Sequence, residues 1–442
     1  MPAPSSQPAD VSASGNDSHD IYDVIVVGAS FAGLSFASVA AARGLRVLVL
    51  ERDAEVGSVV RTTGVLFSDV LDVLDVPARY LMNSVRRVRI QTPDQKPIEI
   101  AAKAFRFYMA DVPGMLRWMA GEATARGATI RCGSPFLGAV RSADGLMRVS
   151  IGSPSASEGG GAASRAPASD VYARFLIGAD GAKSTVAQSM GLDQNTHFLA
   201  GAEWLVENVE LSRETFYLVM DHKLAPGYCV WLAPHGDIVA LGVAGHMREF
   251  KPSASLKVAQ TVFADVADLS NMRVIERKGG IIPTGGRLRK VYRDDERGRA
   301  LLLGDAAGLC GAATGGGIYP ALISGRLAGQ AVSNEVLNGT KGAVKNYLRD
   351  FAQAGRMGHY LQIEDWIRWV LDRMGSNADV AMLYGLFGSP EGLRVLQQTL
   401  LETPIISMDS SFFGVVRNLL GKHPSIYGAA FRTALRRVVA RA

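Results

Sequence analysis

The most constraining feature of this chain is a glycine-rich turn, near the N-terminus, that joins two apolar segments of different kinds. Residues 23–27 read Asp-Val-Ile-Val-Val, a pattern typical of a buried strand, and residues 34–42 are apolar and helix-like. Between them, Gly28 and Gly33 bracket a turn that lets backbone N–H groups approach a phosphate at the start of the helix. A second apolar run at 46–50 completes a strand–turn–helix–strand unit. The pattern therefore predicts a dinucleotide-binding α/β fold.

An acidic residue closes the second strand and strengthens this prediction. Glu51 follows the glycine turn by about 20 residues, the separation at which a carboxylate binds a ribose hydroxyl in dinucleotide folds. Ser30 takes the place of the usual middle glycine; it is small, and its hydroxyl can bond a pyrophosphate. A glycine turn alone is compatible with simple packing, but the flanking strands and Glu51 favour a nucleotide site. The residues expected to contact the nucleotide are Gly28, Ser30, Phe31, Ala32, Gly33, Glu51 and Arg52.

A second cofactor motif follows the apolar residues 300–303, which predict a buried strand. The strand runs into Gly-Asp, a glycine-rich turn and a helix-like segment that continues to Val332. The aspartate can accept a hydrogen bond from a ribityl hydroxyl, and the glycines let backbone N–H groups meet a phosphate or a flavin ring. The residues assigned to this second part of the site are Gly304, Asp305, Gly315, Gly316, Gly317 and Ile318.

The composition is that of an ordinary globular protein of two or three domains. Hydrophobic residues make up 48% and charged residues 20% of the 442 residues, too many for one compact core. Cys132, Cys229 and Cys310 are widely spaced, which indicates a reducing compartment and neither a disulfide framework nor a metal site. Residues 1–20 have no basic segment followed by an apolar one. We therefore expect a disordered tail instead of a signal peptide, and a cytoplasmic protein.

Positive charge is concentrated at the C-terminal end, where no acidic residue follows Asp409. The basic residues beyond that point are Arg417, Lys422, Arg432, Arg436, Arg437 and Arg441. Peripheral contact with an anionic membrane surface is one interpretation, and a solvated basic helix is an equally good one. No nucleic-acid motif is present, so a nucleic-acid partner is not expected.

Three landmarks in a fixed order give the chain a resemblance to a known fold. They are the turn at Gly28, a second turn at Asp180-Gly181, and Gly304-Asp305. In this order they resemble the FAD-dependent fold of p-hydroxybenzoate hydroxylase-like monooxygenases and geranylgeranyl reductases, over residues from about 22 to about 340. The resemblance implies bound FAD, with Asp180 and Arg61 among the residues that contact it.

Further details resemble the reductase branch. Gly308 stands where the hydroxylases usually carry a histidine, and the turn ends in the reductase-like sequence Gly-Gly-Gly-Ile-Tyr. The stretch around Trp231 is similar to a strand that lines the lipid pocket of the reductases. That similarity implies that Tyr228, Trp231 and Pro234 form apolar walls for an apolar small-molecule substrate. Ordinary core aromatics are the alternative interpretation of Tyr228 and Trp231.

The implied fold is an α/β FAD-binding Rossmann-like domain of the glutathione reductase and p-hydroxybenzoate hydroxylase type. It carries an inserted β-sheet substrate domain, predicted from alternating apolar residues, and C-terminal helices. The FAD-binding domain is expected to be discontinuous, and a pocket between the two domains is the expected substrate site. The predicted parts are 21–80, 104–190 and 284–340 for FAD, 81–103 and 191–283 for the β-rich domain, and 341–442 for the helical region.

The resemblance implies an FAD-dependent enzyme that delivers flavin hydride to a carbon–carbon double bond of a prenyl or other apolar substrate. NAD(P)H or a ferredoxin is the expected electron donor, because no second dinucleotide fingerprint is present. Cys310 is a candidate proton donor, with a buried inert thiol as the alternative. Two other functions stay open. One is an FAD-dependent monooxygenase acting on an apolar or aromatic substrate, and the other is a non-redox, flavin-supported cyclase.

Overall fold

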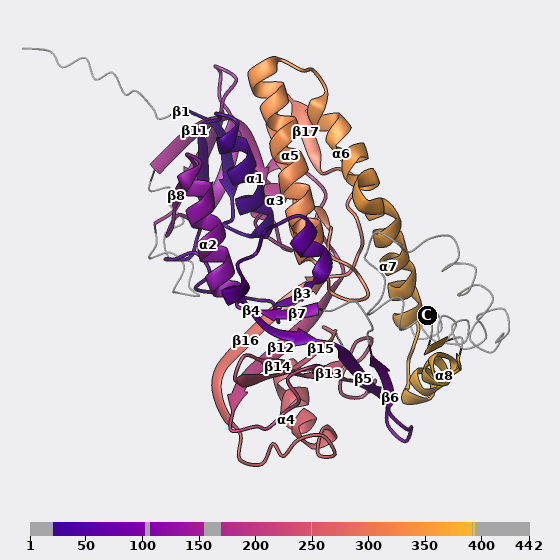
Figure 1. Cartoon of the computed structure of the whole chain (residues 1–442). Helices are drawn as coiled ribbons and strands as arrows, with labels where there is room; N and C mark the ends of the chain where they lie inside the picture. Colours follow the sequence, from indigo (N-terminus) through magenta and orange to yellow (C-terminus); the bar gives the residue numbers. More distant parts are fainter. Residues whose placement is uncertain (1–20, 102–106, 154–168, 249, 391, 394–442) are drawn as a thin grey trace, which may run out of the picture.

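The computed structural model describes residues 21–101, 107–153, 169–248, 250–390 and 392–393. Three β-sheets organise this part of the chain, and helices cover the first of them and run along one side of the molecule (Figure 1). The predicted α/β fold with an inserted β-sheet and C-terminal helices is confirmed. The N-terminal 20 residues, the Gly/Ala/Ser-rich stretch 154–168 and the basic C-terminal segment lie outside the described residues.

The first sheet carries the nucleotide-binding pattern. Its central strands are parallel and lie in the order β18-β11-β1-β2-β8, with β17 antiparallel at one edge and β9 and β10 added through β11. These strands are almost entirely apolar because helices cover both faces, as is usual for parallel sheets. The strands are β1 Ile21–Val27, β2 Val47–Leu50, β8 Thr129–Arg131, β9 Phe136–Arg141, β10 Met147–Ile151, β11 Ser169–Gly178, β17 Tyr292–Asp295 and β18 Gly298–Leu302.

Small residues bring two helices of this domain into direct contact. α1 (Phe31–Ala42) packs along α5 (Ile318–Asn338), and a Cβ atom at Gly325 of α5 would lie 2.3 Å from the carbonyl oxygen of Ala32. Glycine is therefore required for this approach, which places the N-termini of both helices beside one another at the site. The remaining helices of the domain are α2 Val112–Ala125 and α3 Thr185–Met190.

The second sheet has seven strands in the order β16-β12-β15-β14-β13-β5-β6. All neighbours are antiparallel except β13 and β5, and α4 (Pro252–Val262) packs on one face against an apolar cluster. The predicted hairpin around residues 85–101 is present as β5 and β6. The strands are β5 Arg87–Gln91, β6 Ile98–Ala101, β12 Phe198–Glu207, β13 Thr215–Val219, β14 Val230–His235, β15 Ile238–His246 and β16 Arg273–Pro283.

A small third sheet lies between the two large ones (Figure 1). It has the order β3-β7-β4, with β3 Val65–Phe67, β4 Leu81–Val85 and β7 Phe107–Ala110. Thus β4 pairs with β7 and not with the seven-stranded sheet to which residues 81–103 were expected to belong.

The chain ends, within the described part, in helices that run from the first sheet toward the second (Figure 1). They are α6 Ala343–Gln353, α7 Met357–Leu371 and α8 Asn377–Phe387. Tyr347 and Phe351 of α6 are buried in the core of the first domain, as predicted for these aromatics, whereas Trp366 of α7 faces a cavity. Among the helices described, none combines the length and the hydrophobicity that crossing a bilayer would require.

Candidate active site

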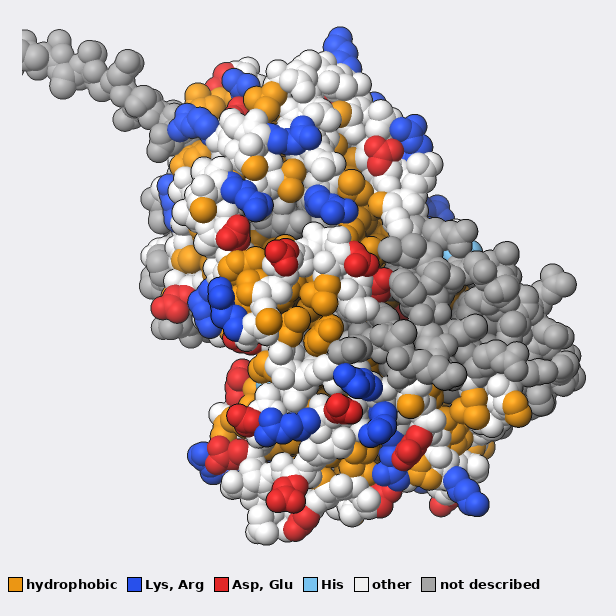
Figure 2. All heavy atoms as spheres, in the orientation of Figure 1, with side chains coloured by type: hydrophobic (Ala, Val, Ile, Leu, Met, Phe, Trp, Pro, Cys, Tyr) orange, Lys and Arg blue, Asp and Glu red, His pale blue; other side chains and the backbone are white. Residues whose placement is uncertain are grey.

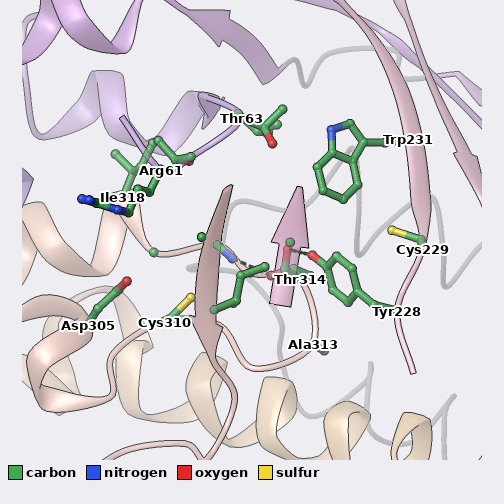
Figure 3. Close-up of a pocket in the computed structure, with 18 of the residues that line it drawn as sticks. Arg61, Thr63, Tyr228, Cys229, Trp231, Asp305, Cys310, Ala313, Thr314 and Ile318 are labelled. Carbon is green, nitrogen blue, oxygen red and sulfur yellow. Dashed lines mark hydrogen bonds between the residues drawn. The ribbon is translucent and has the colours of Figure 1, made fainter. Parts of the chain in front are cut away.

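A cavity of about 670 Å³ lies where the two large sheets, the small sheet and the C-terminal helices meet. Side chains of the cofactor motifs form one end, where Arg61, Asp305, Cys310 and Ile318 lie together, while Trp231 lies across the cavity (Figure 3). Hydrophobic side chains also gather at the surface in the band between the upper and lower parts of the molecule (Figure 2). The structure thus joins residues that are up to about 300 positions apart in the sequence into one site.

The glycine turn after β1 is shaped by steric need. Gly28 has φ +102°, and a Cβ atom there would lie 2.5 Å from the carbonyl oxygen of Ala179. Ser30 is the N-cap of α1: its Oγ accepts from Gly33 N at 3.3 Å and donates to the same Ala179 oxygen at 2.9 Å. The Ser30 hydroxyl therefore holds the turn, a role that the sequence did not indicate. Ser30, Phe31 and Ala32 line the cavity.

Glu51 fixes the turn from the end of β2. Its carboxylate accepts from Ala29 N at 2.9 Å and from Asp53 N at 3.0 Å. Arg52 pairs with Asp53 at 3.7 Å and is half-exposed. Neither Glu51 nor Arg52 lines the cavity, so the structure places both behind the turn.

Asp305 is the polar group most exposed to a ligand's demands in the second motif. It follows β18, lines the cavity, and its carboxylate has no hydrogen-bond or ion-pair partner among the described residues. Burial raises its pKa to about 6. Gly317, whose Cβ atom would lie 3.0 Å from Asp305 Oδ1, begins α5 and leaves that oxygen accessible. A buried carboxylate without a protein donor is well suited to a ligand hydroxyl.

The glycine-rich loop before α5 is held from behind by Glu364 of α7. Glu364 Oε2 accepts from Ala313 N and Thr314 N, each at 2.9 Å, and from Thr314 Oγ1 at 3.1 Å. Tyr228 donates from its hydroxyl to Thr314 O at 2.6 Å (Figure 3). Sequence reasoning missed Glu364, because its helix is some 50 positions from the loop and no local pattern links the two.

Asp180 has a different role from the one predicted. Its Oδ2 accepts from Thr185 N, Thr185 Oγ1 and Val186 N at 2.7–3.1 Å, and its Oδ1 accepts from Ser184 Oγ at 2.6 Å. The carboxylate therefore caps α3 and is fully used there, whereas Gly181 next to it lines the cavity. The motif reaches the site through its glycine.

Arg61 and Cys310 both face the cavity at the cofactor end (Figure 3). Burial and the nearby charge of Arg52 lower the pKa of the Arg61 guanidinium from its ordinary value. Burial raises the pKa of the Cys310 thiol well above its ordinary value, so the thiol stays protonated. A thiol of this kind is a weak nucleophile and a weak acid.

The far wall of the cavity is apolar. Tyr228 and Trp231 line it, but Pro234 does not, because Pro234 is three positions from Trp231 on β14 and an odd separation in a strand reverses the face. The placement of Pro234 in the pocket was therefore wrong. Other apolar lining residues are Val88, Ile90, Ile98, Phe107, Phe216, Leu218, Met220, Trp366, Ile367, Val370, Leu371 and Leu383.

These features fit an FAD molecule. The glycine turn and the N-terminus of α1 suit a pyrophosphate, and the partnerless Asp305 carboxylate suits a ribityl hydroxyl, while Arg61 and the glycine loop offer donors between them. Within the described residues, no group of three or more His, Cys, Asp or Glu side chains is arranged for a metal ion. Fold and site together define a flavin-dependent enzyme.

The comparison with known proteins names the family. The chain belongs to the FAD binding domain family, whose model matches residues 21–323. It is 26% identical to digeranylgeranylglycerophospholipid reductase of Methanocaldococcus jannaschii, over 85% of this chain and 93% of the relative. It is 28% identical to the enzyme of the same name in Methanosarcina mazei, over 74% and 78%. The predicted family is thus confirmed, and the chain is an FAD-dependent oxidoreductase.

Solved structures share the fold. A geranylgeranyl bacteriochlorophyll reductase-like protein of Thermoplasma acidophilum superposes with a TM-score of 0.73 at 20% identity, covering 93% of this chain and 99% of that one. A flavin-dependent brominase superposes with a TM-score of 0.65 at 14% identity, covering 91% and 100%. At these identities the likeness establishes the fold alone.

Proposed function

We propose that this enzyme reduces carbon–carbon double bonds of a prenyl chain or a similar apolar substrate, with FAD as the electron carrier. One observation carries the proposal: a single cavity connects the cofactor motifs to a chamber walled by aliphatic and aromatic side chains. The relatives named as digeranylgeranylglycerophospholipid reductases support the same substrate class.

The residues have distinct tasks at the cofactor end. The turn from Gly28 to Gly33 and the N-terminus of α1 bind the pyrophosphate, and Asp305 accepts from the ribityl chain. Arg61 and the loop Gly315–Ile318 contact the rest of the flavin nucleotide. When bound, FAD supplies a hydride, the two-electron reductant that the chain's own side chains lack.

The apolar chamber binds the hydrocarbon and excludes water. Each buried CH₂ group contributes about 0.8 kcal/mol, so a five-carbon isoprenoid unit gains roughly 4 kcal/mol on entering. Trp231 on β14 and Leu383 on α8 narrow the chamber from opposite elements. A flexible chain is thereby held extended beside the cofactor site, and the double bond is kept dry.

The proposal also covers the electron donor and the place of action. The donor is NAD(P)H or a ferredoxin that binds transiently, because the sequence carries one dinucleotide fingerprint. The protein acts in the cytoplasm and meets its lipid substrate at the membrane surface, where the basic residues after Asp409 contact anionic headgroups.

An anaerobic assay tests the proposal. Purified yellow enzyme is reduced chemically and mixed with a panel of prenylated lipids, prenyl alcohols and aromatic compounds, and the product masses are measured. We expect two added hydrogens per double bond in the prenyl compounds, with one equivalent of flavin oxidised. Conversion that needs oxygen would establish a monooxygenase instead, and conversion without net electron consumption would establish a cyclase. Flavin-free protein is the control.

A further inference from the structure

Four residues form a row across the seven-stranded sheet where it borders the cavity. Lys278 of β16 lies opposite Glu203 of β12, Glu203 lies opposite Gly242 of β15, and Gly242 lies opposite Trp231 of β14. Residues directly opposite one another in a sheet share a face. The side chains of Lys278, Glu203 and Trp231 accordingly all line the cavity.

Gly242 lets the indole of Trp231 lie across β15. A Cβ atom at Gly242 would be 2.0 Å from Cε2 of Trp231, so any other residue would displace the ring. In this position Trp231 Nε1 donates to Glu203 Oε2 at 3.0 Å. The tryptophan is therefore more than an apolar wall, because it also orients an acidic side chain.

Glu203 is a buried and incompletely satisfied carboxyl group. Only 5% of the residue is exposed, and its Oε1 has no hydrogen-bond partner among the described residues. The nearest cation is Lys278, whose Nζ lies 3.8 Å from Oε1 and whose side chain is 9% exposed. Burial raises the pKa of Glu203 and so does the charge of Glu276, while Thr63, Lys278 and Trp231 counteract this.

We propose that Glu203 is the proton donor of the reduction, with Trp231 and Lys278 as positioning residues. The inference rests on the proposed function. The π bond breaks and two C–H bonds form: Glu203 gives a proton to one carbon, and the other carbon receives the hydride, with its electron pair, that reduced flavin provides. The Glu203 carboxylate that remains is stabilised by Lys278 and regains a proton from solvent.

Other acids near the cavity are poorer choices. Asp305 is the only other carboxyl group lining the described part of the cavity, and it lies at the cofactor end with the glycine loop (Figure 3). Cys310, the candidate from the sequence, has a thiol whose pKa burial raises well above its ordinary value. Glu203 instead borders the apolar chamber, beside Thr63 and Trp231.

The substitution Glu203→Gln separates proton donation from packing, because the amide oxygen still accepts from Trp231. Glu207→Gln is the matched control, since Glu207 lies on the same strand, pairs with Arg273 and does not line the cavity. With pre-reduced enzyme and a prenyl substrate, we expect E203Q to form product about 100- to 10,000-fold more slowly, and E207Q to match the wild type. Flavin content and KM stay unchanged. The wild-type rate falls as pH rises and Glu203 ionises, and E203Q lacks this dependence.

A second readout uses flavin-free protein. Infrared titration of the carboxyl C=O band, by difference between wild type and each variant, is expected to show Glu203 ionising at a higher pH than Glu207. Trp231→Phe keeps the ring but removes the N–H donor, so it raises the Glu203 titration further without altering the glutamate.

The outcomes separate the two proposals. An E203Q enzyme that is folded, binds flavin and reduces the prenyl substrate at the wild-type rate overturns the role of Glu203 and leaves the proposed function standing. A Glu203 carboxyl that titrates with Glu207, or is unmoved by Trp231→Phe, overturns it as well. A wild-type enzyme that reduces no prenyl compound overturns the proposed function, whatever the infrared spectra show.

Discussion

Glu364 offers a direct measurement of what holds the cofactor loop in place. All three hydrogen bonds that tie the loop to α7 end on one atom, Oε2, which accepts from Ala313 N, Thr314 N and Thr314 Oγ1. The residue is 2% exposed, so water cannot replace these bonds. Two substitutions therefore differ sharply: Glu364→Ala removes the acceptor, whereas Glu364→Gln keeps an oxygen where Oε2 stood.

The expected magnitude follows from the groups left without partners. In E364A two buried backbone N–H groups lose their acceptor at about 1–3 kcal/mol each, so we expect a loss of about 2–6 kcal/mol in the free energy of unfolding. In E364Q we expect a loss of less than about 1.5 kcal/mol, because the geometry is preserved and only the charge assistance disappears. Arg368 stays paired in both variants, since Asp372 lies 2.7 Å from its Nε.

Urea unfolding of the flavin-free protein, followed by circular dichroism, measures this difference. Flavin binding is a second assay: the loop contains Gly315 and Gly316, which line the cavity, and we expect E364A to bind FAD about 10- to 100-fold more weakly. E364Q should bind FAD nearly as well as the wild type. If E364Q is as unstable as E364A, the buried charge and not the acceptor geometry matters. If both variants match the wild type, the loop is held by something else.

Three further predictions concern single side chains of the cavity. For Asp305, whose pKa rises to about 6, the native state binds the extra proton, so the stability of flavin-free protein should fall as pH rises from about 4 to 6. Asp305→Asn should abolish that slope and weaken FAD binding, as urea titrations and flavin fluorescence would show. Gly242→Ala should cost about 1–3 kcal/mol and shift tryptophan emission, whereas Gly201→Ala, where the nearest atom is 3.6 Å away, should be nearly neutral in the same measurements. Cys310→Ala should keep more than a tenth of the activity, and wild-type Cys310 should resist alkylation at pH 8 by mass spectrometry, because its thiol is protonated.

Much of the cofactor site follows from local sequence because its chemistry is local. The turn at Gly28, the capping position of Ser30 and the strand that ends before Asp305 each depend on residues within one strand–turn–helix unit. Their order along the chain was enough to predict the family. Asp180 was misjudged for the same reason: a helix cap and a ligand contact look alike in a short motif.

The catalytic wall depends on strand register and so escapes a local interpretation. Glu203 is the only charged residue between Phe198 and Val206, a signal that a single strand does not explain. Its meaning requires Gly242 and Trp231, 39 and 28 positions away, to pair in one register, and a shift by one residue would turn all three to other faces. Pro234 failed as a prediction because strand alternation, not sequence proximity to Trp231, decides which side chains reach the cavity.

Three buried carboxyl groups near the cavity differ mainly in how many donors the protein gives them. Glu364 receives three hydrogen bonds at one oxygen, and it serves as a structural anchor that has no capacity left for a ligand there. Asp305 receives none at its carboxylate from the described residues, so a bound molecule must satisfy it, which suits a cofactor that stays. Glu203 receives one from Trp231 and keeps Oε1 unbonded, which orients the group while leaving one oxygen able to exchange a proton. Since leaving a buried polar atom unsatisfied costs free energy, the fold retains that cost only where a ligand or a proton compensates it. The gradient from fully bonded to partnerless carboxyl groups therefore marks scaffold, reaction site and cofactor site in turn.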